Sequence, residues 1–506
     1  MAGKSLGGVR IFDSLPEEAL ASLLDAATER ELDTNETLIR AGDAPSDLFV
    51  VSYGRFSIRS GRKEVAQLGA REVIGELGLI DDRCASADVV AVRPSLVLRI
   101  PIASAREVLI EHPSAALAVG GVVANRLRDS SASDRRAPRV LAIDAGSHSA
   151  ALLEGLADRC HSAVVVDSAA AIPEAEMDNT VLVDATIPGV FPDATLSTRQ
   201  SNRGYGIRIG DVGPSSGFCI GVDPADPKSL DRLSRLVFGG GRVLTLGGGG
   251  FRVLATLGML LEFDQRGIDF DAFIGVSACS PAAVLLGAGV PVEEVVEETV
   301  ACGEALSLGR DFGLTSTSIL NGKSLTDSIK RTCGGLELHH LERPVMLGAT
   351  RLSDRSAVPL VDGPAWRSVR ASASIPIVFP PVQVDGSLFV DGGVADNLPT
   401  RFAYERFADP HVTAVSVGAE SSIEIDDSDF DGVAKRSVRG GGAKIMDVIL
   451  NCLRGDDAGV RADRLISLEF TDAGLLGSSD YDAGLAFGRE RARELLQAEP
   501  WSFERA

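Results

Sequence analysis

The chain has 506 residues, a formal net charge of −21, 45% apolar residues and 24% charged residues. This length predicts roughly three domains rather than one core. The acidic balance excludes a nucleic-acid surface as the main function, because such a surface needs clustered basic side chains. The seven cysteines are odd in number and scattered, which excludes a disulfide framework and a zinc site and favours a reducing compartment.

The N-terminal residues lack the apolar core of a signal peptide. The longest apolar runs, 115–124 and 281–292, are shorter than the roughly 18 residues of a membrane helix. We therefore expect a cytoplasmic protein that touches a membrane at most transiently. A homo-oligomer is compatible with the sequence, and no residue pattern indicates a metal site.

Residues 1–130 begin with a helical pattern over 16–33, followed by short runs of β-forming residues separated by turns, and end with a helix-rich stretch over 103–128. This order is typical of a compact β-roll with flanking helices. A polar linker, 128–138, leads to apolar strands that alternate with other segments over 139–225, which predicts a small parallel α/β domain. Residues 226–506 again alternate strands and helices and form the third predicted domain.

The stretch "RVLTLGGGGFRVLATLGMLLEF" predicts a strand (242–246), four glycines (247–250) and a helix. Consecutive glycines let the backbone approach another group closely and present successive N–H donors to an anion. That anion is either a phosphate or the oxyanion of an acyl transfer. The phosphate alternative lacks support, since no Lys-Ser or Lys-Thr follows and Arg252 or Val253 stands where a third glycine would be needed.

A second strand-to-helix turn, "DAFIGVSACSPAAV" (271–284), carries Ser277 at the bend. Gly275 fits the nucleophile turn G-x-S-x-G, but Cys279 occupies the position of its second glycine. A helix N-cap is the alternative interpretation of the serine. Cys279 is itself a conceivable nucleophile, but it falls in the first helical turn and should face away from the serine.

The base for such a serine is not a histidine, because none of the six histidines lies in a loop typical of a catalytic triad. In "GSLFVDGGVADNLP" (386–399) an apolar strand ends at Asp391 before two glycines. An aspartate can take the serine proton directly if a buried site raises its basicity. The alternative is a carboxylate that only caps the turn.

With these three motifs in order, residues of about 230–495 resemble the patatin-like phospholipase family, a serine–aspartate group on an α/β/α hydrolase fold. The family pattern Gly-Gly-Gly-x-Arg corresponds to Gly248, Gly249, Gly250 and Arg252. The resemblance implies Ser277 as nucleophile, Asp391 as base, the glycine amides as oxyanion hole, and Arg252 as a brace for that loop. It implies hydrolysis of phospholipid or lysophospholipid acyl esters without a cofactor.

Two positions depart from that pattern. Val253 and Cys279 stand where the family usually has glycine, at points where backbones approach closely. A side chain there could shift the serine by a fraction of an ångström, and such a shift can cost about 100-fold in rate. A non-catalytic sensor or scaffold on a degenerate hydrolase fold is therefore the alternative function.

Residues of about 9–128 resemble the cyclic-nucleotide-binding domain. In that family a Gly-Glu-Leu segment and a following arginine hold the sugar and cyclic phosphate, which suits a carboxylate on a ribose hydroxyl and a guanidinium on a phosphate. The corresponding residues here are Gly75, Glu76, Leu77, Arg83, Ala85 and Ser86. The segment between Glu76 and Arg83 is about two residues shorter than usual. The resemblance implies cyclic AMP or cyclic GMP as a regulatory ligand, and a β-roll kept for protein contact is the alternative. The whole arrangement resembles neuropathy-target-esterase-like proteins.

Overall fold

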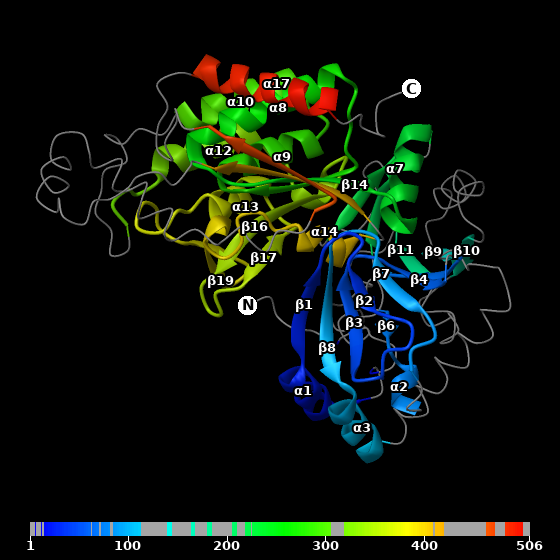
Figure 1. Ribbon diagram of the computed structural model, residues 1–506. Helices are drawn as coiled ribbons and strands as arrows, with labels where there is room; N and C mark the ends of the chain where they lie inside the picture. Colours follow the sequence, from blue (N-terminus) through cyan, green and yellow to red (C-terminus); the bar gives the residue numbers. More distant parts are fainter. Residues whose placement is uncertain are drawn as a thin grey trace, which may run out of the picture. The chain divides into compact units, whose positions relative to one another are not determined.

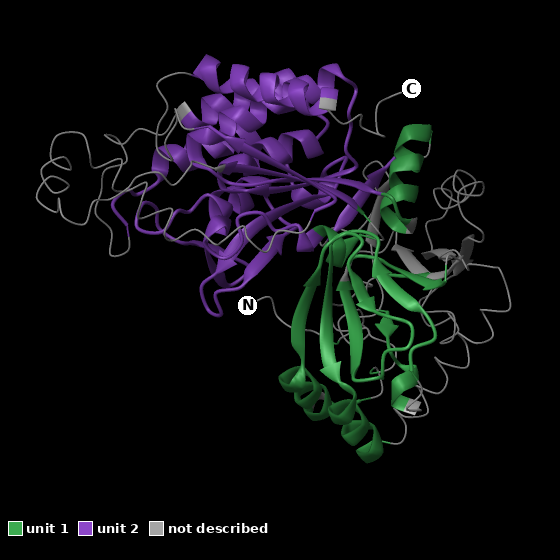
Figure 2. Cartoon of the chain, in the orientation of Figure 1, with its two compact units in different colours: residues 1–214, 223–240, 403–410 green, residues 215–222, 241–402, 411–506 purple. Residues whose placement is uncertain are grey.

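The computed structural model describes residues 6, 12, 15–61, 63–69, 72–80, 84–112, 139–143, 163–166, 180–184, 205–209, 218–223, 225–304, 318–407, 410–418, 462–470 and 481–498. The chain divides into two compact units, which Figure 2 colours separately. The first comprises Met1–Pro214, Asp223–Gly240 and Ala403–Pro410, and the second comprises Ser215–Val222, Gly241–Phe402 and His411–Ala506. The division into three domains with boundaries at 130, 139 and 226 stays a prediction.

The first unit opens with short strands between helices, drawn in blue and cyan in Figure 1. Its elements are α1 (Glu17–Ala26), β1 (Thr28–Leu32), β2 (Thr37–Ile39), β3 (Asp47–Tyr53), β4 (Phe56–Ser60), β5 (Lys63–Leu68), β6 (Val73–Ile74), α2 (Leu77–Ile80), β7 (Asp88–Ala91), β8 (Ser95–Pro101) and α3 (Ile102–Glu111). The strands form two antiparallel sheets, in the orders β1-β8-β3-β6 and β2-β7-β4-β5. The predicted β-roll with helices beside it is confirmed.

The helical prediction over 16–33 is wrong in its second half. The helix ends at Ala26, and Thr28–Leu32 is a strand paired antiparallel with Ser95–Pro101. Leu32 is fully buried in the core of the roll. Pairing with a strand more than 60 residues away therefore overrides the local helical pattern. The end of the predicted helical stretch 103–128 lies outside the described residues.

Four strands follow in the predicted α/β region, and all four were expected from their apolar runs. They are β9 (Arg139–Ile143), β10 (Ala163–Val166), β11 (Thr180–Asp184) and β12 (Tyr205–Ile209). The strand order is β10-β9-β11-β12, and the three pairings are parallel. The first unit also includes α7 (Pro227–Phe238), which begins after Asp226, whose carboxylate accepts from the backbone N–H groups of Lys228 and Ser229.

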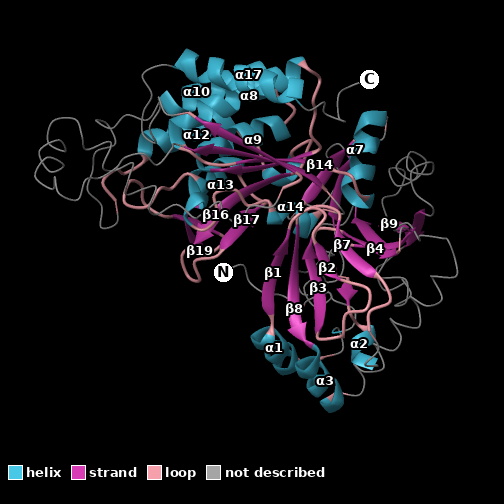
Figure 3. Cartoon of the chain, in the orientation of Figure 1, coloured by secondary structure: helices cyan, strands magenta, loops and turns pink. Residues whose placement is uncertain are grey.

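The second unit is built on one mixed sheet with helices against it (Figure 3). Its strands are β14 (Arg242–Leu246), β15 (Ala272–Val276), β16 (Val345–Arg351), β17 (Ala357–Leu360), β18 (Val382–Val384), β19 (Ser387–Asp391), β20 (His411–Gly418) and β21 (Arg464–Glu469). The unit also contains β13 (Cys219–Val222), which is not part of this sheet. The main sheet has the order β18-β19-β16-β15-β14-β20-β21, and β17 pairs with β16. Strands β16, β15, β14, β20 and β21 are parallel, and β17, β18 and β19 join antiparallel.

The helices of this unit are α8 (Val253–Gln265), α9 (Ser280–Gly287), α10 (Val292–Glu304), α12 (Lys323–Cys333), α13 (Ala365–Ser372) and α17 (Tyr481–Ala498). Helix α14 (Arg401–Arg406) crosses the boundary between the units, and short 3-10 turns occupy Gly250–Arg252, Ser277–Cys279, Leu338–His340 and Gly392–Val394. Helix α8 is buried from Val253 to Phe263, between the sheet and helices α10 and α17. Glycines make this packing close, since a Cβ at Gly484 would lie 2.6 Å from the Cβ of Leu254.

Candidate active site

Two chain turns meet at the carboxyl ends of the neighbouring parallel strands β14 and β15, where α/β sheets commonly bind their ligands. Strand β14 ends at Leu246, as predicted, and the glycine loop leads through a 3-10 turn into α8. Strand β15 ends at Val276, and Ser277 starts the turn into α9. A Cβ at Gly248 would lie only 2.6 Å from the Cβ of Ser277. Glycine is therefore needed for the loop to lie directly against the serine.

Ser277 adopts a left-handed backbone conformation, with φ of 52°. L-residues other than Gly, Asn and Asp rarely adopt this region, and such strain concentrates at functional sites. The turn is held by Ser372, whose hydroxyl accepts from the backbone N–H of Ser277 at 2.9 Å and from the Ser280 hydroxyl at 2.8 Å. The Ser372 hydroxyl in turn donates to the Gly348 carbonyl at 2.6 Å. One buried side chain thus ties the strained turn to strand β16.

Asp391 lies at the end of β19, where the sequence predicted a strand end. Its Oδ2 accepts a hydrogen bond from the Ser277 hydroxyl at 2.6 Å, and its Oδ1 accepts from the Gly393 backbone N–H at 2.8 Å. One carboxylate oxygen thus faces the serine and the other caps the turn, and the role of Asp391 as base stays a prediction. The two side chains are buried, at 8% exposure for Ser277 and 6% for Asp391.

The aspartate is positioned through its backbone as well. Its N–H donates to the Ser374 carbonyl at 2.9 Å, and its carbonyl accepts from the Thr350 hydroxyl at 2.8 Å. A carboxylate whose backbone and second oxygen are both fixed keeps one oxygen aimed at the serine, which is the preorganisation that proton transfer requires.

Asn397 holds the glycine loop through a side-chain hydrogen bond. This buried side chain donates to the Gly248 carbonyl at 3.3 Å. Gly247 still pairs with β20, since its N–H donates to the Val415 carbonyl at 2.9 Å. The backbone N–H of Arg252 donates to Gly249 at 3.2 Å and closes the turn. The Arg252 side chain is buried, and its bracing role stays a prediction.

The side chains of the two residues that depart from the glycine pattern, Val253 and Cys279, are both buried. Cys279 is fully buried, and burial raises the pKa of its thiol from 9.0 to about 12, partly opposed by a hydrogen bond with Thr256. Such a thiol carries almost no thiolate at neutral pH, which argues against Cys279 as nucleophile. Val253 has ordinary helical dihedrals, and its side chain is buried at the start of α8. Neither residue displaces Ser277 from hydrogen-bond distance of Asp391.

Gly275 is needed for the packing of the turn, because a Cβ there would lie 2.6 Å from the Cβ of Ala283.

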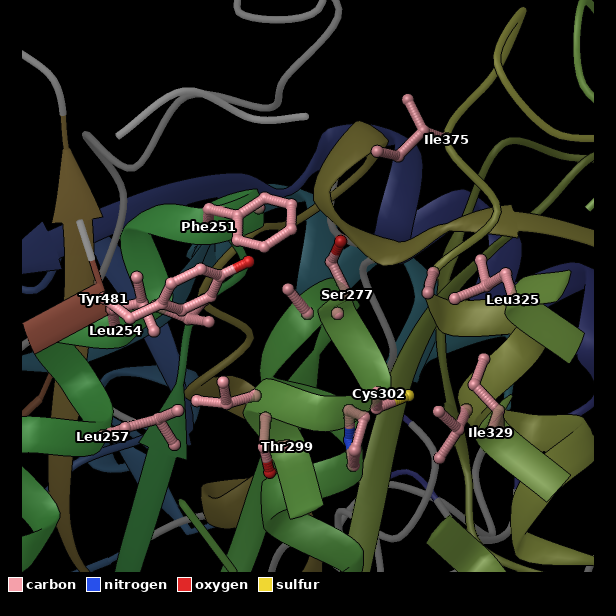
Figure 4. Close-up of a pocket in the computed structure, with 18 of the residues that line it drawn as sticks. Phe251, Leu254, Leu257, Ser277, Thr299, Cys302, Leu325, Ile329, Ile375 and Tyr481 are labelled. Carbon is pink, nitrogen blue, oxygen red and sulfur yellow. The ribbon is translucent and has the colours of Figure 1, made fainter. Parts of the chain in front are cut away.

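A cavity of about 90 Å³ lies beside Ser277. Figure 4 shows Ser277 between Phe251 and Tyr481 on one side and Ile375 and Leu325 on the other. Leu257, Thr299, Cys302 and Ile329 lie below them in this view. The lining comes mainly from apolar residues of α8, α10, α12 and α13, including Val253, Leu254, Leu257, Ile329 and Val369. A hydrocarbon chain therefore fits this cavity better than a polar group.

Sequence reasoning missed Ser372 and Asn397 as residues that support the site. Each acts through a partner 95 or 149 residues away, so no local pattern marks it. That none of the histidines serves as the base stays a prediction. His339 lies 2.7 Å from Asp362 and stacks against His340, away from the residues that line the cavity.

In the first unit, the predicted nucleotide segment begins at the end of β6. Gly75 has φ of 89°, and a Cβ there would lie 2.8 Å from the Asp47 carbonyl, so the chain needs glycine at this turn. Glu76 is buried and Leu77 is exposed. Ala85 is fixed by backbone hydrogen bonds to Gly42 and Asp43 at 2.8 Å each, and Ser86 follows it. Arg83 lies outside the described residues.

Comparison with known proteins identifies both parts of the chain. A model of the patatin-like phospholipase family matches residues 244–404, which contain the glycine loop, Ser277 and Asp391. A model of the cyclic nucleotide-binding domain matches residues 29–112. The chain therefore carries a patatin-like domain of the phospholipase and esterase class, preceded by a cyclic nucleotide-binding domain.

The relatives of the chain are NTE family proteins. One from Mycobacterium tuberculosis strain H37Rv is 25% identical over 99% of this chain and 97% of its own length. Lysophospholipase NTE1 of Kluyveromyces lactis is 29% identical over 48% of this chain, and neuropathy target esterase sws of Drosophila melanogaster is 28% identical over 40%. These two matches cover only 17% and 15% of the relatives. None of the helices described here has the length and hydropathy of a membrane span.

Proposed function

We propose that the chain hydrolyses acyl esters of phospholipids or lysophospholipids with Ser277 as nucleophile and Asp391 as its base. The observation that carries this proposal is the 2.6 Å hydrogen bond from the Ser277 hydroxyl to Asp391 Oδ2. The apolar cavity beside Ser277 supports an acyl chain as the bound part of the substrate. Lysophospholipase activity is named for the fungal relative, which strengthens the choice of lipid esters.

The reaction has two balanced halves. Ser277 Oγ attacks the ester carbonyl carbon while its proton passes to Asp391, and the carbonyl oxygen becomes an anion. Backbone N–H groups of the glycine loop at Gly248, Gly249 and Gly250 stabilise that oxyanion. The C–O bond to the alcohol then breaks, and the departing oxygen takes the proton from Asp391.

Deacylation repeats these steps with water as the attacking group. Asp391 accepts a proton from water, the hydroxyl attacks the acyl-serine carbonyl, and the fatty acid leaves as Ser277 regains its proton. The fixed second oxygen of Asp391 suits this repeated use, because the carboxylate need not reorient between the two halves.

The test is hydrolysis of a p-nitrophenyl acyl ester and of lysophosphatidylcholine by the wild type and Ser277→Ala. We expect release of p-nitrophenol and fatty acid by the wild type, and a loss of at least about 1,000-fold in the variant. If both proteins are equally inactive on every chain length, the chain is instead a non-catalytic sensor or scaffold. Labelling of Ser277 by a fluorophosphonate, located by peptide mass spectrometry, tests the nucleophile without a known substrate.

We further propose that cyclic AMP or cyclic GMP binds the first unit and regulates the hydrolase. The residues that would hold it are Gly75, Glu76, Leu77, Ala85 and Ser86, together with Arg83. The buried Glu76 directly after the glycine turn at Gly75 supports this assignment, because it falls within the region that the cyclic nucleotide-binding model matches. A ligand that binds only the folded state raises the melting temperature, so each nucleotide is added in a thermal-shift assay. No rise with either nucleotide would favour a β-roll kept for protein contact.

A further inference from the structure

Ile377 has a backbone conformation that its side chain disfavours. Its φ is 70°, in the left-handed region where a β-branched residue clashes with its own backbone. The other non-glycine residues with positive φ in the described part of the chain are Asn35, Ser277, Arg355 and Asp385, none of which is β-branched. Glycine or asparagine would take this conformation at a lower steric cost.

The strain does not serve the packing of the core. The Ile377 side chain is 45% exposed, whereas its neighbours Val378 and Phe379 are buried. The loop is nevertheless fixed: the Ile377 carbonyl accepts from Ile319 N–H at 2.8 Å, and the Phe379 N–H donates to Ile375 at 2.9 Å. The chain thus holds an apolar side chain partly exposed, at a steric cost that the backbone hydrogen bonds of the loop offset.

The loop forms part of the wall of the cavity beside Ser277. Ile375 and Phe379, two residues to either side of Ile377, both line that cavity. Figure 4 shows Ile375 on the same side of the cavity as the Ser277 hydroxyl. The partly exposed Ile377 therefore belongs to the same loop as two residues of the cavity wall.

We propose that Ile377 inserts into a lipid surface and docks the mouth of the cavity against it. The inference rests on the proposed function, since a lipid acyl chain must leave its bilayer or micelle to reach Ser277. An apolar contact is the mode that the charge of the chain favours, because a net charge of −21 opposes electrostatic attraction to anionic lipid. The Ile377 side chain then holds this loop of the cavity wall against the lipid.

The test compares Ile377→Asn and Ile377→Gly with Ile110→Asn. Both replacements at 377 tolerate the left-handed conformation, so they remove the apolar side chain without adding strain. Ile110, on α3 of the other unit, is 78% exposed and provides the matched control for loss of an exposed isoleucine. Docking is measured by flotation with phosphatidylcholine vesicles in a Ser277→Ala background, which separates binding from hydrolysis.

We expect both Ile377 variants to lose about ten-fold in vesicle partitioning, whatever the salt concentration, since one buried isoleucine side chain supplies that much. Ile110→Asn should float like the parent. The Ile377 variants are also made in the protein that retains Ser277. Their hydrolysis of soluble p-nitrophenyl butyrate should stay within about two-fold of the wild type, while their hydrolysis of lipid in vesicles falls with the partitioning.

Three outcomes would overturn the proposal: unchanged flotation of the Ile377 variants, an equal loss in Ile110→Asn, or a dimer that Ile377→Asn converts to monomer without changing flotation. The last would assign the exposed side chain to a second copy of the chain. A protein that floats but hydrolyses no ester would contradict the proposed function and leave the docking result standing.

Discussion

Ser277 Oγ and Asp391 Oδ2 lie 2.6 Å apart although 114 residues separate them in the chain. The contact forms because β15 and β19 flank the same strand, β16, one parallel and one antiparallel to it. The register places Asp391 opposite Ala349, and Val276, the residue before Ser277, opposite Gly348, so the two side chains meet across the same level of β16.

Asp391→Asn should lower kcat by about 1,000-fold or more, because an amide cannot accept the serine proton. The fold should persist, since the amide oxygen can still accept from the Gly393 N–H, as the Oδ1 does now at 2.8 Å. The measurement is single-turnover release of p-nitrophenol, with circular dichroism as the control for folding. Activity of the folded variant near that of the wild type would contradict the assignment of Asp391 as base.

Gly248→Ala should reduce kcat by about 100-fold, since its Cβ would lie 2.6 Å from the Cβ of Ser277 and push the serine or the loop aside. Gly249→Ala is the matched control. Its Cβ would have only an ordinary contact of 3.4 Å with Val417, and its φ of −178° suits any residue. Steady-state kinetics on one ester compares the two. Equal losses would show that the close approach of Gly248 to Ser277 is not what the reaction requires.

Ser372→Ala should lower both stability and activity, because its hydroxyl supports the strained turn of Ser277 through the hydrogen bonds to Ser277, Ser280 and Gly348. Loss of buried hydrogen bonds of this kind costs about 1–3 kcal/mol. Ser280→Ala removes only one of them and should have the smaller effect on both quantities. Urea denaturation and kcat are measured for each variant. A Ser280→Ala variant as impaired as Ser372→Ala would contradict a positioning role for Ser372.

Cys279 should make the protein less stable at alkaline pH. Burial raises the pKa of its thiol to about 12 in the folded chain, so unfolding favours ionisation once the pH exceeds the ordinary value of 9.0. The stability is fully present below pH 9 and is lost as pH rises toward 12, by about 1.4 kcal/mol per pH unit. Cys279→Ala should therefore have a flatter dependence of unfolding free energy on pH than the wild type.

Urea midpoints between about pH 9 and pH 11 give that comparison, with Cys84→Ala as the control because Cys84 is an exposed free cysteine. Parallel curves for wild type and Cys279→Ala would show that the thiol ionises as readily in the folded chain as in the unfolded one. In the folded wild type at neutral pH, iodoacetamide should label Cys84 and leave Cys279 unmodified.

The sequence by itself determined the local elements on which the site is built. The strands 242–246 and 272–276, the glycine loop, the helices after them and the strand ending at Asp391 all follow from apolar runs and glycines that act over a few residues. The resemblance of the three motifs to one family led us to expect Ser277 and Asp391 together. Parallel pairing of β14 and β15 explains why the glycine loop meets Ser277, but not the place of Asp391, because β19 is antiparallel.

Only the tertiary structure decided how those motifs are held and what surrounds them. Ser372 and Asn397 support the site through hydrogen bonds that span 95 and 149 residues. Thr28–Leu32 is a strand because Ser95–Pro101 lies beside it, against the local helical pattern. The complete burial of Cys279 and the strained, partly exposed position of Ile377 are likewise set by packing and backbone pairing between distant segments, which no window of sequence contains.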